Sequence, residues 1–152
     1  MSTGIDIVKQ QIKIAAGNQL DIDRDDITIK SHALECRINA EDPVIFLPSP
    51  GTIHELRFPH GPAFRVDEGI YEGYNVPFYY DSLLMKFITW GKGREEAIFR
   101  MKRALAESPI KGVKTTIPLH RAVLEDKDFL SGMYSTSLLN KLELKNKILE
   151  KC

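Results

Sequence analysis

The chain has 152 residues, its 21 lysines and arginines balance 21 aspartates and glutamates, and 43% of its residues are hydrophobic. This is the length of one ordinary domain, with enough core to fold without disulfides or a metal. The balanced charge argues against a general nucleic-acid binder, which needs a basic excess. Neither an apolar run of about 18 residues nor a secretory signal is visible. Two cysteines, Cys36 and Cys152, are too few for a disulfide framework. We therefore expect a cytoplasmic protein that binds neither nucleic acid nor membrane.

An amphipathic helix is predicted near the amino terminus. Apolar side chains recur at helical spacing from Ile5 to Ala15, with lysine and glutamine residues between them. Thr3 is the expected cap, and Gly17-Asn18 is the expected left-handed stop. The polar residues 21–26 are expected to form a solvated connection to the next element.

Strands are predicted in the middle of the chain. Residues 32–40 alternate between apolar and polar side chains, the pattern of a half-buried strand. Residues 52–58 and 63–66 are expected to form two more strands, joined across the proline- and glycine-rich residues 59–62. The dense apolar run at 83–90 predicts a mostly buried strand.

The last third of the chain is predicted to be mainly helical. Residues 95–107 carry one apolar stripe and form an expected amphipathic helix. A short strand at 113–115 is expected before a helix with Pro118 in its first turn, where proline is tolerated. A final helix is expected to begin after Ser135 or Ser137.

The order of these elements predicts the fold class. Several strands follow one helix, and helices then follow strands, without alternating βαβ units. We expect an α+β domain over residues 1–144, with a mainly antiparallel β-sheet flanked by helices, and a frayed helical tail over residues 145–152.

Three familiar kinds of site are disfavoured by residue spacing. Residues 91–94 (GKGR) lack the spacing of a Walker loop, and Glu96 stands where a dinucleotide turn needs its third glycine. His32 and Cys36 would lie roughly 13 Å apart along a strand, too far for a nucleophile and its base. Cys36 is therefore expected to pack in the core. The four histidines show no metal-ligand spacing, so no metal site is expected in this chain.

A charged and amide-bearing strand face is the strongest candidate from chemistry alone. Glu35, Arg37 and Asn39 share one face of the predicted strand, about 7 Å apart. One interpretation is a solvated face with a cross-strand ion pair. The other is an arginine fork for a carboxylate, bicarbonate or phosphate. Spacing alone does not decide between them.

Six segments resemble one family in collinear order. Residues 32–51 (HALECRINAEDPVIFLPSPG) closely resemble the C-terminal domain of biotin carboxylase, the ATP-dependent component of acetyl-CoA, propionyl-CoA and pyruvate carboxylases. Further similar segments are TGIDIV (3–8), QIKIAAG (11–17), VPFYYDSLLMK (76–86), GVKTT (112–116) and YSTSLL (134–139). The resemblance covers nearly all of residues 3–142.

The resemblance implies one lobe of a larger ligase. The family's ATP-grasp fold and its metal-binding carboxylates lie upstream of this region, so we expect the 152 residues to be inactive alone. The parent enzyme would use ATP, magnesium and bicarbonate to carboxylate biotin on a carrier domain, and would form a homodimer. None of these ligands is expected to bind the fragment stably. The alternative is a dimerisation or assembly module without direct chemistry. An unrelated antiparallel β-rich binding domain would require the motif match to be a coincidence.

The resemblance also implies roles for individual residues. Arg37 matches the family arginine that faces biotin and bicarbonate, and is the expected catalytic residue. Glu35 and Asn39 are supporting candidates. Thr136 corresponds to a family contact with the adenine of ATP, although a helix cap explains it equally well. Arg65 matches a family arginine at the subunit interface, with a solvated strand residue as the alternative.

Overall fold

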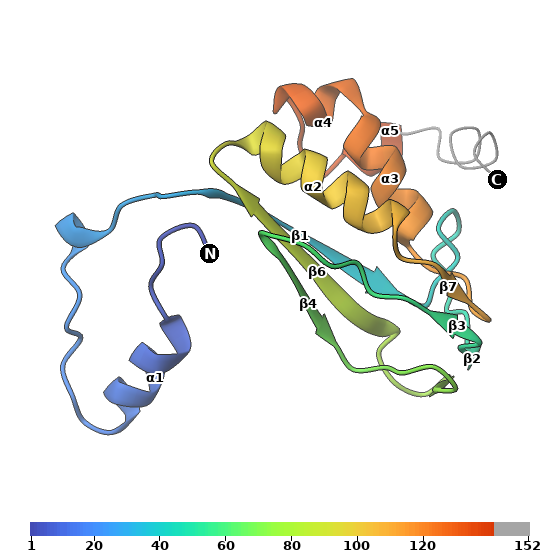
Figure 1. Cartoon of the computed structure of the whole chain (residues 1–152), viewed down its shortest axis with the longest axis horizontal. Helices are drawn as coiled ribbons and strands as arrows, with labels where there is room; N and C mark the ends of the chain where they lie inside the picture. Colours follow the sequence, from blue (N-terminus) through green and yellow to red (C-terminus); the bar gives the residue numbers. More distant parts are fainter. Residues whose placement is uncertain (142–152) are drawn as a thin grey trace.

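The protein consists of a compact body and an amino-terminal arm that extends away from it (Figure 1). The structure, a computed structural model, describes residues 1–141. The arm spans residues 1–31 and the body begins with the first long strand at residue 32. The frayed tail predicted at 145–152 lies outside the described residues. No helix within residues 1–141 is long and apolar enough to cross a membrane.

The arm contains the predicted amino-terminal helix, α1 (Ile7–Ala15). Its cap is not Thr3 as expected. The Asp6 carboxylate takes this place and accepts a hydrogen bond from the Lys9 amide at 3.0 Å, because Asp6 lies directly before the first helical residue. Gly17 adopts a φ of 86°, which confirms the predicted left-handed stop. Within the predicted connection at 21–26, residues Arg24–Asp26 form a short 3-10 helix, η1.

An antiparallel three-stranded sheet forms the centre of the body. Its strand order is β1-β6-β4, and Cys36, Phe87 and Val66 pair across it in one row. The strands are β1 (His32–Asn39), β6 (Leu83–Gly91) and β4 (Phe64–Glu68). The predicted strands at 32–40, 63–66 and 83–90 are thereby confirmed, and so is the α+β class with an antiparallel sheet.

The expected strand at 52–58 is wrong. This segment is divided between two short ladders at the far end of the body (Figure 1). The break occurs at Ile53, which is fully buried and donates its amide to the Tyr74 carbonyl at 2.9 Å. The ladders pair β2 (Gly51–Thr52) with β5 (Asn75–Val76), and β3 (Glu55–Leu56) with β7 (Ile110–Lys111).

Helices cover one face of the central sheet (Figure 1). The structure confirms α2 (Arg94–Ala106), α3 (Ile117–Glu125) with proline in its first turn, and α5 (Leu138–Lys141). It adds the unpredicted α4 (Lys127–Ser131), whose amino end is capped by the Asp126 carboxylate. The strand expected at 113–115 is absent. The strand lies earlier, at β7, and the chain then passes into α3.

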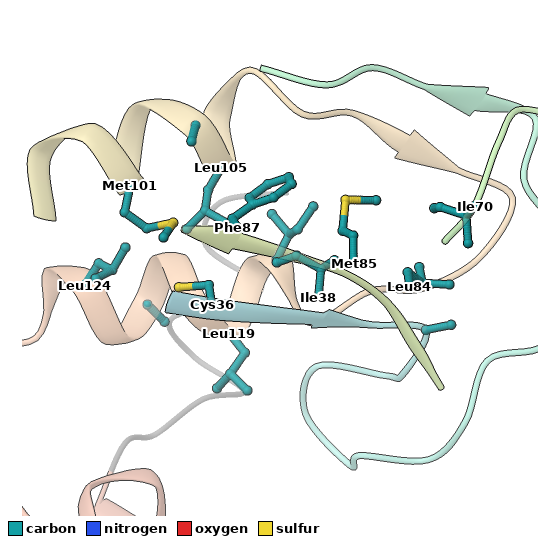
Figure 2. Close-up of a cluster of buried hydrophobic side chains, with 14 of the residues drawn as sticks. Cys36, Ile38, Ile70, Leu84, Met85, Phe87, Met101, Leu105, Leu119 and Leu124 are labelled. Atoms are coloured by element: carbon teal, nitrogen blue, oxygen red, sulfur yellow. The ribbon is translucent and has the colours of Figure 1, made fainter. Parts of the chain in front are cut away.

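The core lies between the sheet and the helices α2 and α3 (Figure 2). Phe87 and Ile38 from the sheet and Met101 from α2 are fully buried. Leu124 from α3 is only 1% exposed. Burying each such side chain contributes about 1.5–3 kcal/mol, so this layer is the main source of stability in the body. Within residues 1–141 the helices lie on one face only (Figure 1), so no helix of this part covers the other side of the sheet, called the outer face below.

Candidate functional site

The outer face of the central sheet carries two rows of side chains. Alternate residues of a strand point to opposite sides, so the neighbours of the buried Cys36 point outward. Strand pairing places Glu35, Ile88 and Arg65 in one row and Arg37, Lys86 and Asp67 in the next. Arg37 and Arg65, which were predicted for separate sites, thus lie on one face, two strands and one row apart, or roughly 12 Å.

Arg37 is exposed and its nearest cross-strand neighbour has the same charge. Lys86 lies directly opposite on β6. Within residues 1–141, no carboxylate pairs with the Arg37 guanidinium. The expected alternative of a cross-strand ion pair is therefore not what the fold builds at Arg37. Like charges placed opposite each other are unfavourable, and such a pair can bind an anion.

The backbone around Arg37 is held by the segment that leads into α3. The Thr116 hydroxyl donates to the backbone carbonyl of Arg37 at 3.1 Å and accepts from the backbone N–H of Asn39 at 3.0 Å. The backbone N–H of Thr116 donates to the backbone carbonyl of Asn39 at 3.1 Å. His120 Nε2 lies 2.8 Å from the Arg37 carbonyl oxygen. Sequence reasoning missed both residues, although Thr116 belongs to the GVKTT segment already singled out.

His120 is a neutral donor in this arrangement. Burial lowers the pKa of His120 below its usual 6.5, and the hydrogen bond to Arg37 offsets this shift only in part. A carbonyl oxygen can only accept, so Nε2 carries the proton.

Protonation of His120 is expected to destabilise the fold. A folded-state pKa below the unfolded one gives a stabilising contribution that is complete above about pH 6.5 and is lost as the pH falls. Urea unfolding followed by Trp90 fluorescence should show that wild type loses stability relative to His120→Gln between pH 7.5 and pH 5. An identical pH dependence in both proteins would contradict the assignment.

Asn39 joins a cluster that ties the end of β1 to the start of β6. Its side-chain nitrogen, Nδ2, donates to Glu41 Oε1 at 3.0 Å and to the Ser82 hydroxyl at 3.2 Å. The Ser82 hydroxyl also donates to Glu41. Asn39 Oδ1 is buried and has no hydrogen-bond partner among the described residues. The structure thus directs this supporting candidate to Glu41 and Ser82, whereas Glu35 stays exposed beside Ile88.

Arg65 is exposed but already engaged. Its guanidinium binds both oxygens of Asp67, at 2.5 and 2.9 Å, and this hydrogen bonding raises the pKa of Arg65. Exposed pairs of this kind contribute little to stability. Its place on the outer face makes the pair available to a neighbouring molecule.

Thr136 lies in the segment between α4 and α5. The helices cover one face of the sheet (Figure 1), and the Arg37 side chain points to the other face. Thr136 is exposed, and the hydroxyl that bonds the start of α5 belongs to Ser135, which accepts from the Ser137 amide at 3.3 Å. Next to it is a hollow of about 340 Å³, lined mainly by residues 132–135, Ser137 and Leu138. Within this chain alone, the Thr136 and Arg37 positions are therefore not brought together.

Two other motifs have structural roles. In the GKGR segment, Gly93 precedes α2 and the Lys92 amide donates to the Glu96 carboxylate at 2.6 Å, which is a helix-start turn. Cys36 is 5% exposed and faces the core, and burial raises its pKa to about 12 (Figure 2).

In the part of the chain that the structure covers, no three His, Cys, Asp or Glu side chains form a group that could hold a metal.

Cys36 is expected to be unreactive in the folded protein. Its raised pKa leaves about a thousandfold less thiolate at pH 8 than a free cysteine has, and burial blocks access as well. An aromatic disulfide reagent applied to the Cys152→Ser variant should label Cys36 only after urea unfolding. Rapid labelling of the folded variant would show that the β1 core face opens.

The comparison with known proteins gives one consistent result. Residues 35–141 match the family described as the biotin carboxylase C-terminal domain. The biotin carboxylase of Haemophilus influenzae is 51% identical over 141 residues, which are 93% of this chain and 32% of that protein. Biotin carboxylase 1 of Bacillus subtilis is 50% identical over 140 residues, 91% of this chain and 31% of that protein.

The comparison with solved structures points to the same family. The biotin carboxylase domain dimer of the 2-oxoglutarate carboxylase of Hydrogenobacter thermophilus, in complex with MgADP, ADP and bicarbonate, matches with a TM-score of 0.88 and 47% identity, over 93% of this chain and 31% of that one. The biotin carboxylase subunit of a pyruvate carboxylase matches with a TM-score of 0.90 and 45% identity, over 97% of this chain and 33% of that one. The chain spans about a third of these relatives, and it belongs to the biotin carboxylase family, as its C-terminal domain.

Proposed function

We propose that this chain is the C-terminal lobe of a biotin carboxylase, that it supplies Arg37 to the biotin and bicarbonate site, and that it has no activity alone. The observation that carries the proposal is the exposed Arg37 guanidinium, which faces Lys86 and has no carboxylate partner within residues 1–141. Membership of the biotin carboxylase family supports biotin and bicarbonate as the ligands of this cationic position.

In the proposed reaction, ATP phosphorylates bicarbonate to carboxyphosphate and leaves as ADP. Carboxyphosphate breaks down to CO2 and phosphate, and the CO2 carboxylates a ureido nitrogen of biotin on a carrier domain. When that nitrogen loses its proton to the released phosphate, negative charge spreads onto the ureido oxygen, and the nitrogen then attacks CO2. A permanently charged guanidinium held next to this oxygen stabilises the charge in a water-excluded site. Arg37 is suited to this role because a guanidinium presents several donors in a planar fork.

The magnesium and most nucleotide contacts are assigned to the upstream part of the enzyme. Magnesium prefers carboxylate oxygens held in octahedral geometry, and the described residues contain no such group of acids. The open hollow beside Thr136 is suited to a flat base rather than to phosphates, since the side chains around it are uncharged except for Asp128. We assign it to the adenine of ATP.

The exposed apolar surface of the arm is an argument for a large upstream partner. None of the residues of α1 is buried, and Ile7, Val8 and Ile12 are 68%, 64% and 65% exposed. Ile7 also lines an apolar hollow of about 520 Å³, together with Ile5, Leu20, Ile22 and Ile27. So much contiguous apolar surface marks a contact site.

The limits of the family match support a contact with the part of the enzyme that precedes the C-terminal domain. The C-terminal domain match begins at residue 35, after the arm, whereas a relative matched over 141 of the 152 residues must include most of residues 1–34. The arm is thus shared with whole enzymes but lies outside their C-terminal domain. We infer that its apolar side packs against the preceding, ATP-binding part of the enzyme.

The activity test compares the chain with a chimera that joins it to the upstream part of the Haemophilus influenzae relative. With ATP, magnesium, bicarbonate and free biotin, we expect the chimera to carboxylate biotin and the 152-residue chain to show no turnover. Clear turnover by the chain alone would refute the claim that upstream residues are indispensable.

The contact made by the arm has its own test. When the upstream part is produced as a separate chain, it should co-purify with the wild type but not with the Ile7→Ser/Ile12→Ser variant. Phe99→Ser, which changes a residue 70% exposed on α2, is the matched control and should co-purify normally. Equal co-purification of all three proteins would overturn the assignment.

A second candidate function is assembly without direct chemistry. It is favoured by the uncovered outer face, where the Arg65–Asp67 pair is exposed on β4, and by the dimeric state of the Hydrogenobacter thermophilus domain. Sedimentation at tens of micromolar should then give the mass of two chains, and Arg65→Glu should shift the mass toward one. A strict monomer for the wild type counts against this function for the isolated chain.

A further inference from the structure

The backbone of Arg37 is more firmly anchored than its exposed side chain. We propose that Thr116 and His120 are positioning residues for Arg37: they hold the peptide groups on its carboxyl side and so set the direction in which its side chain leaves β1. The proposal rests on the proposed role of Arg37. Neither Thr116 nor His120 is expected to touch a substrate.

The anchoring replaces a missing neighbouring strand. Among the described residues β1 pairs only with β6, so its other edge lacks a ladder of strand hydrogen bonds in this part of the chain. Thr116 supplies three contacts at this edge, to the Arg37 carbonyl and to both backbone groups of Asn39. An edge strand that ends in a register shift, as β1 does between Ile38 and Asn39, would otherwise be the part of the sheet most free to move.

The Arg37 carbonyl has both of its acceptor positions in use. One is taken by the Thr116 hydroxyl at 3.1 Å and the other by His120 Nε2 at 2.8 Å. A side chain leaves the backbone in a direction fixed by the dihedral angles of its own residue. Two donors on this carbonyl and one acceptor for the Asn39 amide therefore fix the direction in which Arg37 leaves β1.

The anchor itself is rigid. Thr116 is 5% exposed and directly precedes α3, and His120 lies one turn later on the same side of that helix. Leu119 and Leu124 hold α3 in the core, at 7% and 1% exposure (Figure 2). Helix α3 thereby fixes the backbone position of Arg37 relative to the hydrophobic core.

The test uses paired variants in the chimera. Thr116→Val and His120→Leu remove the donors at nearly constant shape, and we expect each to lower kcat for biotin carboxylation by about tenfold or more, because small misplacements of a reacting group cost up to about a hundredfold. KM for ATP should not change. Thr116→Ser and His120→Gln keep a donor and should restore most of kcat.

Thr89→Val is the matched control, since Thr89 is a buried hydroxyl that donates to the Ala97 carbonyl at 2.8 Å on the opposite side of the sheet from Arg37. It should lower stability and leave kcat unchanged. In the 152-residue chain, Thr116→Val should speed amide exchange at Asn39, and Thr89→Val should not. If Thr116→Val and His120→Leu retain wild-type kcat while Arg37→Ala abolishes turnover, the positioning role is wrong and the proposed function stands. Wild-type turnover in Arg37→Ala would overturn the proposed function instead.

Discussion

Replacing Arg37 with alanine in the chimera should lower kcat for biotin carboxylation by roughly 10²–10³-fold, the usual effect of removing one preorganised donor at a developing negative charge. The protein should stay folded. Arg37 is exposed on β1 and lies opposite Lys86, so the substitution removes a like-charge contact and no buried contact. The unfolding free energy should be unchanged or higher by up to about 0.5 kcal/mol.

Two further variants separate charge from geometry. Arg37→Lys keeps the charge but loses the planar fork, so it should recover only part of kcat. Lys86→Ala removes the neighbouring cation while leaving the fork in place, and should have the smaller effect. The measurements are steady-state turnover and urea unfolding on the same preparations. Wild-type turnover in folded Arg37→Ala would remove this residue from the site.

The long strands were predictable because their signal is local. Alternation over 32–40 and the apolar run at 83–90 each lie within one segment, and both match the observed strands closely. The segment 52–58 failed for the opposite reason. Its two halves pair with residues near 75 and near 110, and no pattern within the segment shows that its partners differ. Tertiary pairing, which propensity does not encode, divides it.

The candidate site was predictable in part. Arg37 was identified through residue chemistry and family resemblance, yet its neighbours on the outer face follow from strand register. Thr116 and His120 were missed because their contacts with Arg37 join residues about eighty positions apart in the sequence. A hydroxyl that replaces a strand contact leaves no periodicity to detect.

The amino-terminal helix shows what amphipathicity can and cannot establish. The stripe from Ile5 to Ala15 correctly predicted α1. A stripe says that one side of a helix is buried, but not against what. Here the described chain does not cover it, and the exposed Ile7 and Ile12 are the main physical support for an upstream partner.

Replacing Gly112 with alanine is expected to have the largest effect on stability. Gly112 has a φ of 108°, a region that L-residues rarely adopt. An added Cβ would also overlap the Thr52 carbonyl oxygen and lie 3.1 Å from the His54 ring. Backbone strain and a clash with backbone atoms together should lower the unfolding free energy by more than about 3 kcal/mol.

Gly132→Ala is the matched control for this prediction. Gly132 also has a positive φ, of 82°, but an added Cβ there meets nothing within 4 Å, so only the conformational cost of about 1–2 kcal/mol applies. Urea unfolding of both variants measures the difference, which is the contribution of the close approach to Thr52. Because Gly112 opens the turn that leads to Thr116, a folded Gly112→Ala chimera should also lose kcat, and Gly132→Ala should lose less. Equal destabilisation by the two substitutions would show that the 110–116 segment is free to move away from β2, and the anchoring of Arg37 through Thr116 would then lose its rigid base.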